Sequence, residues 1–165
     1  MKIEFEEINQ FPRGTLADML ADAYGFDPRW AAEHLEDWRS LDSFFFDNPA
    51  IAEKYGFVTV VDDEPVGFIS WDPRHRPEYE EIGHNCILAR YKRRGYGTLQ
   101  LREAVRRILL DRPRRIVVTT NASLLPAQKM YERAGFRKVN ERPSPASFAG
   151  ALFDYEFLPP PPTSH

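Results

Sequence analysis

Cysteine is almost missing from the sequence, and so are several other features that would define a class of protein. Cys86 is the one cysteine among 165 residues, which excludes an intramolecular disulfide and favours a small buried side chain over a reactive thiol. The His and Cys residues do not have the spacing of a zinc site, and we expect no metal. No apolar run approaches ~18 residues, so we expect no membrane span. The first ten residues lack the cationic and apolar segments of a signal peptide, and we expect a cytoplasmic protein.

Charge of one sign is not in excess either. The formal net charge is -3, which argues against a basic protein that binds nucleic acid with its whole surface. Aromatic residues, in contrast, are plentiful: the chain has 12 Phe, 7 Tyr and 3 Trp. That composition can build one hydrophobic core without metal or disulfide crosslinks. We therefore expect a single domain over residues 1–158 and a disordered, proline-rich tail over residues 159–165.

Apolar periodicity predicts a mixed α/β domain of about seven strands and about four helices. The strands are expected over residues 2–8, 57–61, 66–71, 82–89, 115–120, 136–142 and 151–158. Thr15 could cap a first helix, and Asp27 is expected to cap a second helix that has Pro28 at its first position. Two more are expected within residues 92–111 and 126–134. The aromatic run over residues 41–46 either continues the second helix or bends over the sheet.

The segment from Lys92 to Leu109 combines a basic glycine loop with an amphipathic helix. Its apolar residues recur at helical spacing, which leaves Gln100 on the outward face with the charged side chains. Three cations precede the helix, although the macrodipole favours acids at that end. Local helix stability does not explain this arrangement, whereas a bound polyanion would. Gly95 and Gly97 would let backbone N–H groups approach phosphate oxygens, and Thr98 could add a hydroxyl donor.

Two motifs in this region resemble the signatures of GNAT acetyltransferases. The segment contains neither GxxxxGK[ST] nor GxGxxG. Residues 92–97, Lys-Arg-Arg-Gly-Tyr-Gly, are similar to the acetyl-CoA signature Q/R-x-x-G-x-G/A, with Lys92 in the Q/R position. Residues 131–136, Tyr-Glu-Arg-Ala-Gly-Phe, are similar to a second signature, a helix that ends in Y-x-x-x-G-F. The family often has Asn seven residues before this Tyr, where this chain has Leu124, and Asn121 lies three residues earlier.

The resemblance implies the GNAT fold: an α/β (α+β) domain with a mixed, mostly antiparallel sheet flanked by helices. It also implies acetyl-CoA as a cosubstrate. In the family, the strands before and after the cradle helix splay apart, and an N–H near Ile87 or Leu88 would bind the thioester carbonyl. The residues that the resemblance assigns to acetyl-CoA are Ile87, Leu88, Ala89, Lys92, Arg93, Arg94, Gly95, Tyr96, Gly97, Thr98, Asn121 and Gln128.

The resemblance also suggests how protons move during the reaction. Tyr131 would protonate the leaving thiolate, although it is as well suited to packing as a core aromatic. Glu81 lies eleven residues before Lys92, where the histone-acetyltransferase branch of the family has its base. His84 and a chain of water molecules are alternatives, because an unperturbed His titrates near neutrality. Glu80 is a rival for the role, but in a charged loop it is expected to be solvated.

The resulting expectation is an N-acetyltransferase that moves an acetyl group from acetyl-CoA to a primary amine of a small molecule or peptide by direct attack. An acyl-CoA-binding or sensing module without turnover is the alternative. RNA binding by the Arg-rich helix is disfavoured, because residues 99–115 contain no aromatic side chains for base stacking. The expected partners are acetyl-CoA and an amine acceptor, without nucleic acid or membrane, and a homodimer is compatible with the sequence.

Overall fold

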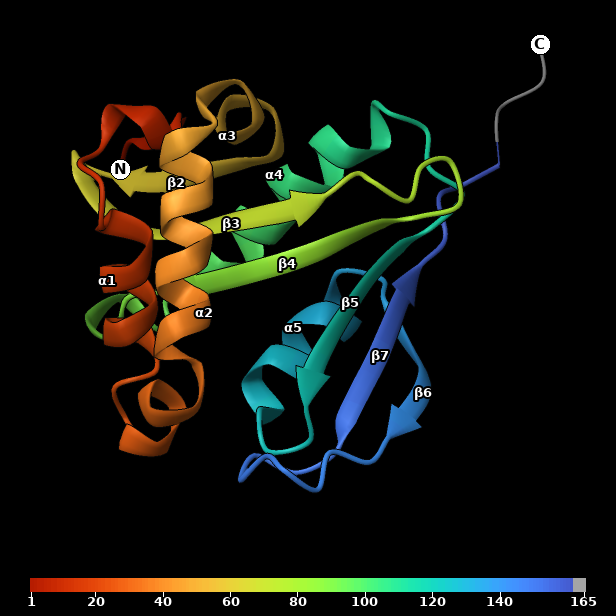
Figure 1. The fold of residues 1–165 in the computed structure, drawn as a ribbon. Coiled ribbons are helices and arrows are strands. Elements are labelled where there is room, and N and C mark those ends of the chain that lie inside the picture. Colours follow the sequence, from red (N-terminus) through yellow and green to blue (C-terminus); the bar gives the residue numbers. More distant parts are fainter. Residues whose placement is uncertain (162–165) are drawn as a thin grey trace, which may run out of the picture. The chain divides into compact units, whose positions relative to one another are not determined.

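The structure is a computed structural model that describes residues 1–161; the last four residues of the expected tail lie outside the described part. Figure 1 shows the strands and helices in the order in which they follow along the chain. The strands are β1 Ile3–Glu6, β2 Gly56–Val61, β3 Glu64–Asp72, β4 Glu80–Ile87, β5 Ile116–Asn121, β6 Arg137–Arg142 and β7 Leu152–Phe157. The helices are α1 Thr15–Ala23, α2 Pro28–Asp47, α3 Pro49–Tyr55, α4 Tyr96–Leu109 and α5 Leu125–Arg133, and short 3-10 turns span Ile8–Gln10 and Ala89–Tyr91.

The sheet has seven strands in the order β1-β2-β3-β4-β5-β7-β6. The pairs β1–β2, β2–β3, β5–β7 and β6–β7 are antiparallel, and β4–β5 is parallel. The mixed, mostly antiparallel sheet predicted from the sequence is therefore confirmed. The described residues hold five helices rather than about four, because residues 49–55 form a helix that the apolar pattern did not reveal.

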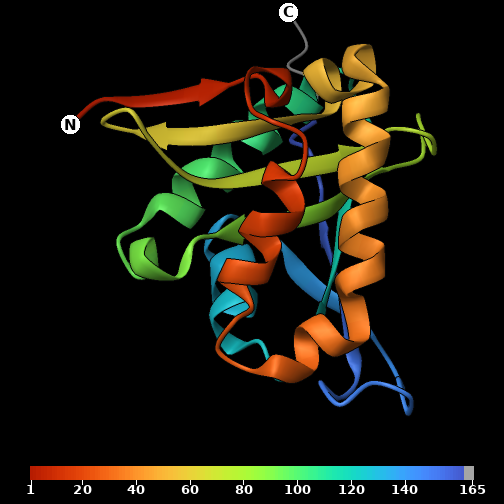
Figure 2. The same cartoon turned by 60° about the vertical axis from the view of Figure 1, so that its left-hand side comes forward.

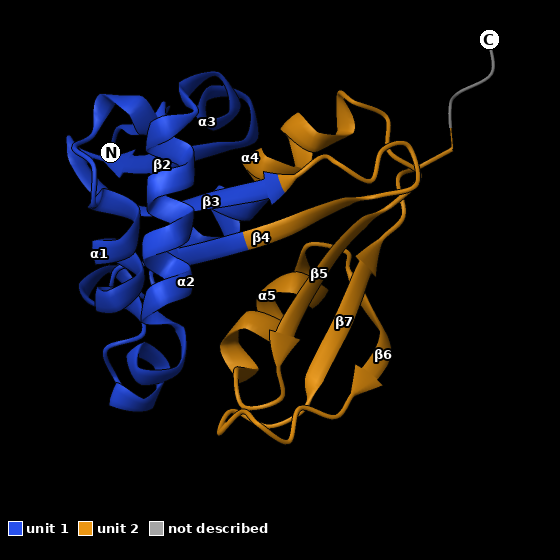
Figure 3. Ribbon diagram, in the orientation of Figure 1, with its two compact units in different colours: residues 1–71, 84–101 blue, residues 72–83, 102–165 orange. Residues whose placement is uncertain are grey.

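The chain folds as two compact units that interleave in the sequence. The first contains residues 1–71 and 84–101, and the second contains residues 72–83 and those from Arg102 onward (Figure 3). Strand β4 and helix α4 each begin in one unit and end in the other. The expectation of a single domain over residues 1–158 stays a prediction, which a folding experiment can test.

In the first unit, α1 and α2 lie side by side on one face of the strands (Figures 1 and 2). Helix α2 begins as predicted, because the Asp27 carboxylate accepts the Arg29 N–H at 3.0 Å and Pro28 follows it. The helix continues to Asp47, so the aromatic run over residues 41–46 belongs to it. Phe45 in that run is buried and Phe44 is half-exposed.

Helix α1 receives its N-terminal cap from α2 rather than from its own sequence. Gly14 precedes α1 with φ of 100°, and no side chain of the local sequence caps the helix. The buried Asp42 carboxylate of α2 accepts the N–H groups of Gly14, Leu16 and Ala17 at 2.8, 2.9 and 3.1 Å. Three N–H groups that would lack partners are thereby satisfied, and the two helices are fastened together.

In the second unit, α5 packs on one face of β5 and β7. Tyr131 of α5 lies against Phe136 and Tyr155, with ring centroids 5.7 and 6.1 Å apart. Gly135, which follows α5, has φ of 98°, and a Cβ there would lie 3.2 Å from the Phe157 ring. Glycine therefore both ends the helix as predicted and allows the chain to pass close to β7.

Candidate functional site

The basic loop expected to bind phosphate lies in the first unit, between the turn Ala89–Tyr91 and the start of α4 at Tyr96. Arg93 and Gly95 both have left-handed backbone conformations, with φ of 65° and 86°. A Cβ at Gly95 would meet no atom within 4 Å, so the requirement for glycine there comes from its backbone conformation alone. Residues 92–95 are each exposed to solvent as whole residues, although the Lys92 ammonium contact is partly buried.

The loop presents a row of backbone donors that have no acceptor. The Lys92 N–H donates to the Ala89 carbonyl at 3.3 Å, and the next N–H along the chain to make a hydrogen bond is that of Leu99, which donates to the Gly95 carbonyl at 3.2 Å. Within the described chain, none of the N–H groups of residues 93–98 donates to a protein acceptor. Free N–H groups at a helix start, together with the positive end of the helix dipole, form an anion site. The side chains of Arg93 and Arg94 add positive charge to it.

The start of α4 is fixed by Gln100, which corrects a prediction. The sequence places Gln100 on the outward face, but its side chain is fully buried. Its Nε2 donates to the Phe68 carbonyl, to Asn85 Oδ1 and to the Cys86 carbonyl at 2.8, 2.7 and 3.1 Å. Its Oε1 accepts from the Thr59 hydroxyl at 2.8 Å. This one side chain therefore ties α4 to β2, β3 and β4, and helical periodicity alone could not reveal that.

The Lys92 side chain reaches the end of α1. Its ammonium group donates to the carbonyl of Ala23 and lies 4.9 Å from the centroid of the Phe26 ring. Burial lowers the pKa of Lys92. The N–H of Ala89 also has an acceptor within the protein, because it donates to Asp22 Oδ2 at 2.8 Å. Two residues that the family resemblance assigns to acetyl-CoA are thus engaged with α1.

Strand β4 loses its pairing with β5 before either strand ends. The register runs from Glu80↔Ile116 to Ile82↔Val118, whereas β4 continues to Ile87 and β5 to Asn121. The N–H of Leu88 donates to the Val66 carbonyl at 2.8 Å. Of the two residues named for the thioester contact, Ile87 therefore remains the candidate.

The remaining predicted cofactor residues lie in the second unit. The Gln128 amide donates to the carbonyls of Asn121 and Ala122, both at 3.0 Å, and its side chain is buried. The Asn121 carbonyl also accepts the Leu124 N–H at 3.0 Å. Gln128 therefore shapes the loop between β5 and α5. Tyr131 is buried, and its ring belongs to the aromatic cluster under β7.

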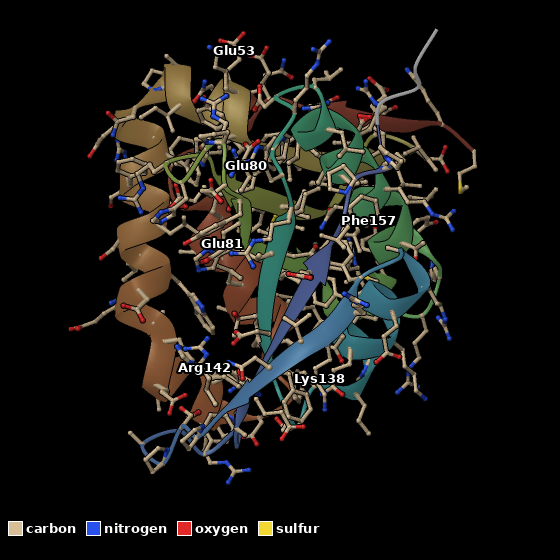
Figure 4. The ribbon with its side chains drawn as sticks, turned by 90° about the vertical axis from the view of Figure 1, so that its right-hand side faces the viewer. Glu53, Glu80, Glu81, Lys138, Arg142 and Phe157 are labelled. Carbon is tan, nitrogen blue, oxygen red and sulfur yellow. The ribbon has the colours of Figure 1, made fainter. Side chains whose placement is uncertain are left out.

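Glu81 lies on the face of the second unit's sheet that is opposite α5. Its register partner on β5 is Val117, and Figure 4 shows Glu81 and Arg142 on one side of the sheet, with Lys138 and Phe157 on the other. Arg142 binds Asp154 through Nε and Nη2, each at 2.8 Å, and this pair lowers the pKa of Asp154 to about 2. The Glu81 carboxylate accepts no hydrogen bond from the described residues, so it is available to a ligand.

Glu80 is not solvated as the sequence suggests; it is fully buried, and neither oxygen of its carboxyl group has a hydrogen-bond partner among the described residues. Burial, followed by the nearby Asp111 charge, raises the pKa of Glu80 to about 7. An ion pair between Arg76 Nη1 and Asp111 Oδ1 at 3.2 Å lies close to it. In the first unit, burial lowers the pKa of His84, and the charge of Asp37 on α2 opposes that shift. His84 is thereby favoured in its neutral form.

Among the described residues, no group of three or more His, Cys, Asp or Glu side chains could hold a metal ion. No helix in the described part is long and apolar enough to span a membrane.

Comparison with known proteins gives the same family as the two motifs. The model of the acetyltransferase (GNAT) family matches residues 16–136. The fold is similar to that of the Escherichia coli ribosomal-protein-S18-alanine N-acetyltransferase, with 16% identity, a TM-score of 0.67, and 95% of this chain and 92% of that chain covered. It is also similar to a chain of the NatC complex bound to Gag peptide and CoA, with 14% identity, a TM-score of 0.69, and 97% and 100% covered.

A third similar structure is the aminoglycoside 6'-acetyltransferase type Ii, with 19% identity, a TM-score of 0.68, and 98% of this chain and 100% of that chain covered. A search of curated protein sequences finds no match. At these identities the solved structures establish the shared fold, while the family model covers most of the chain. This chain belongs to the GNAT family of acetyltransferases.

Proposed function

We propose that this protein is an N-acetyltransferase that transfers an acetyl group from acetyl-CoA to a primary amine. The observation that carries the proposal is the row of free N–H groups over residues 93–98, at the start of α4. An acidic ligand with several oxygens satisfies these donors, and the pyrophosphate of acetyl-CoA has that chemistry. The family supports the same ligand, because the NatC structure contains CoA.

The chemistry requires one bond to form, one to break, and two protons to move. The neutral amine nitrogen attacks the thioester carbon, and an oxyanion forms that the N–H of Ile87 would stabilise. Glu81 takes the proton that the attacking nitrogen releases. The carbon–sulfur bond then breaks, and the Tyr131 hydroxyl would give its proton to the leaving thiolate. The protein itself forms no covalent intermediate.

The acceptor is proposed by class only. Similar structures include a ribosomal-protein-S18-alanine N-acetyltransferase and an aminoglycoside 6'-acetyltransferase, so both peptide and small-molecule amines belong in a first panel. Glu81 suits either class, because an ammonium group can bind to its carboxylate, which accepts no hydrogen bond from the described residues, before the ammonium loses a proton.

The experiment measures thermal stability with and without acetyl-CoA, and then CoA release with the amine panel. Acetyl-CoA should stabilise the parent protein, and a Gly97→Leu variant should lose that gain because its side chain would block the approach of phosphate to the backbone. Equal stabilisation of both proteins would locate the ligand elsewhere. Binding without CoA release from any amine would favour the alternative, a module that senses acyl-CoA.

A further inference from the structure

Two contacts fasten the phosphate loop to the last turn of α1, and both lie within the first unit. The Asp22 carboxylate accepts the Ala89 N–H at 2.8 Å, and the Lys92 ammonium donates to the Ala23 carbonyl. The Lys92 ammonium also lies on the Phe26 ring. We call these contacts the α1 latch. They join residues 22–26 to residues 89–92, which are more than 60 positions apart in the sequence.

We propose that Lys92 is a positioning residue that holds the phosphate loop against α1 through the latch, and that it does not itself bind phosphate. This inference rests on the proposed binding of acetyl-CoA to residues 93–98. It assigns the charge of the loop to two tasks. Arg93 and Arg94 would supply positive charge to the ligand, and Lys92 would keep the loop in place.

The end of α1 provides the acceptor that Lys92 needs. Ala23 is the last residue of α1, and carbonyls at that end of a helix lack intrahelical partners. A cation there also complements the negative end of the helix dipole. The aromatic ring supplies a second attraction, since cations within about 6 Å of a ring centroid are bound by its face. With both contacts made, the ammonium is partly removed from water, and this is the reason its pKa falls.

Asp22 is otherwise poorly placed. An acid in the last turn of a helix faces the negative end of the dipole, which costs stability. Its two roles, accepting the Ala89 N–H and lying near the Lys92 charge, offset that cost. A carboxylate this close to a phosphate loop would repel the ligand if it served only as a surface charge. The latch instead uses it to order the loop.

The latch also reaches the aromatic turn after α1. Phe26 is 64% exposed, and its ring lies near Tyr24 and Trp30 at centroid distances of 6.3 and 6.5 Å. Trp30 is buried and begins the aromatic face of α2.

The test titrates CoA into the parent, Lys92→Met, Lys92→Arg, Asp22→Ala and the Lys92→Met/Asp22→Ala double variant at low and high salt. Arg93→Met is the control that removes the same charge from a neighbouring position. We expect Lys92→Met and Asp22→Ala each to weaken CoA binding by about tenfold, roughly the contribution of one charge-assisted hydrogen bond. The fold loss of CoA affinity in the double variant should be smaller than the product of the two single losses, because both contacts fix the same loop. Lys92→Arg should restore most of the affinity.

The salt dependence separates positioning from phosphate binding. Salt screens exposed charge pairs, so Arg93→Met should flatten the dependence, while Lys92→Met should leave it close to that of the parent. Asp22→Ala distinguishes two roles of Asp22 by the direction in which CoA affinity changes. If Asp22 only repelled the ligand, its removal would tighten CoA binding. If Asp22 belongs to the latch, its removal weakens CoA binding. Tighter binding in Asp22→Ala, or a flattened dependence in Lys92→Met, overturns the proposal.

A second measurement needs no ligand and so separates this inference from the proposed function. Amide hydrogen exchange at Ala89 and in residues 23–26 should accelerate in Lys92→Met and Asp22→Ala but not in Arg93→Met. Unchanged exchange in the two latch variants overturns the latch, even if CoA binds as proposed. If the parent shows no CoA binding at all, the proposed function fails while the exchange result still decides whether the latch exists.

Discussion

Two adjacent glutamates at the start of β4 meet opposite environments because successive strand residues face opposite sides of a sheet. Glu80 is fully buried without a hydrogen-bond partner, whereas Glu81 is half-buried on the face opposite α5. Burial keeps the first in its neutral form up to a pH of about 7, and the second is accessible to a ligand. The two residues therefore predict two different pH dependences, one in stability and one in rate.

The stability of the protein should fall as the pH rises from about 4.5 to about 7. The pKa of Glu80 is raised from 4.5 to about 7, so in this range the folded state keeps a proton that the unfolded state has released. At about 1.4 kcal/mol for each unit of pKa shift, the loss amounts to about 3 kcal/mol. Glu80→Gln should remove this loss and be the more stable protein above pH 7. Urea unfolding from pH 4.5 to pH 8 measures it, with Glu81→Gln as the control; parallel curves for parent and Glu80→Gln would contradict the prediction.

The rate should depend on Glu81 near neutral pH. Positioned acid–base groups contribute about 10²- to 10⁴-fold, so Glu81→Gln should lower kcat/KM within that range. The loss should shrink at high pH, where the amine is already neutral. His84→Gln is the matched control variant, and it should lower kcat/KM much less. If the Glu81→Gln profile overlays the parent at every pH, Glu81 has no part in the reaction, and a loss confined to His84→Gln assigns the role to His84.

Tyr131 should affect turnover rather than cofactor binding. Tyr131→Phe keeps the ring that packs on Phe136 and Tyr155 and removes only the hydroxyl group. We expect kcat to fall by about 10²-fold or more, with acetyl-CoA affinity unchanged, because thiolate protonation belongs to the chemical step. Single-turnover rates and acetyl-CoA titration measure the two quantities. A parent-like rate under conditions in which chemistry limits turnover leaves Tyr131 with a packing role.

At the scale of elements, α1 depends on a cap that only the folded chain provides. Asp42→Ala should lower the free energy of unfolding by about 2 kcal/mol or more, because it leaves buried N–H groups of α1 without an acceptor. Asp47→Ala is the control on the same helix, since its ion pair with Arg13 at 2.7 Å is exposed and should be worth under about 1 kcal/mol. Chemical denaturation measures both. Equal losses in the two variants would show that the α1 cap contributes little.

The elements that the sequence predicts are those with local signals. Asp27-Pro28 starts α2, and the similar pair Asn48-Pro49 stands at the start of the helix that the apolar pattern missed, although the Asn48 side chain makes no cap hydrogen bond there. The end of α2 could not be predicted, because a continuous aromatic run has no period. For the candidate site, the sequence predicted a basic loop with Gly95 and Gly97 before the helix that is now α4. It could not predict that Gln100 is buried or that Lys92 turns to α1, since both depend on partners distant in the sequence.

At the scale of the whole molecule, the two units should unfold together. All three Trp residues, Trp30, Trp38 and Trp71, lie in the first unit, whereas circular dichroism reports on the helices and strands of both. Because β4 and α4 each continue from one unit into the other, unfolding of either unit interrupts both elements. We expect coincident urea transitions by Trp fluorescence and by circular dichroism, as for a single cooperative domain. Two separated midpoints would contradict the expectation of one domain over residues 1–158.

The burial of Cys86 should prevent the folded protein from reacting with thiol reagents. The residue is only 6% exposed, and burial raises the pKa of its thiol to about 12, so the reactive thiolate is scarce at pH 8. A dye that colours free sulfhydryls will therefore register the CoA released by turnover without a background from the enzyme. Since each chain has one cysteine, the same dye becomes a counter of unfolded molecules once denaturant is added.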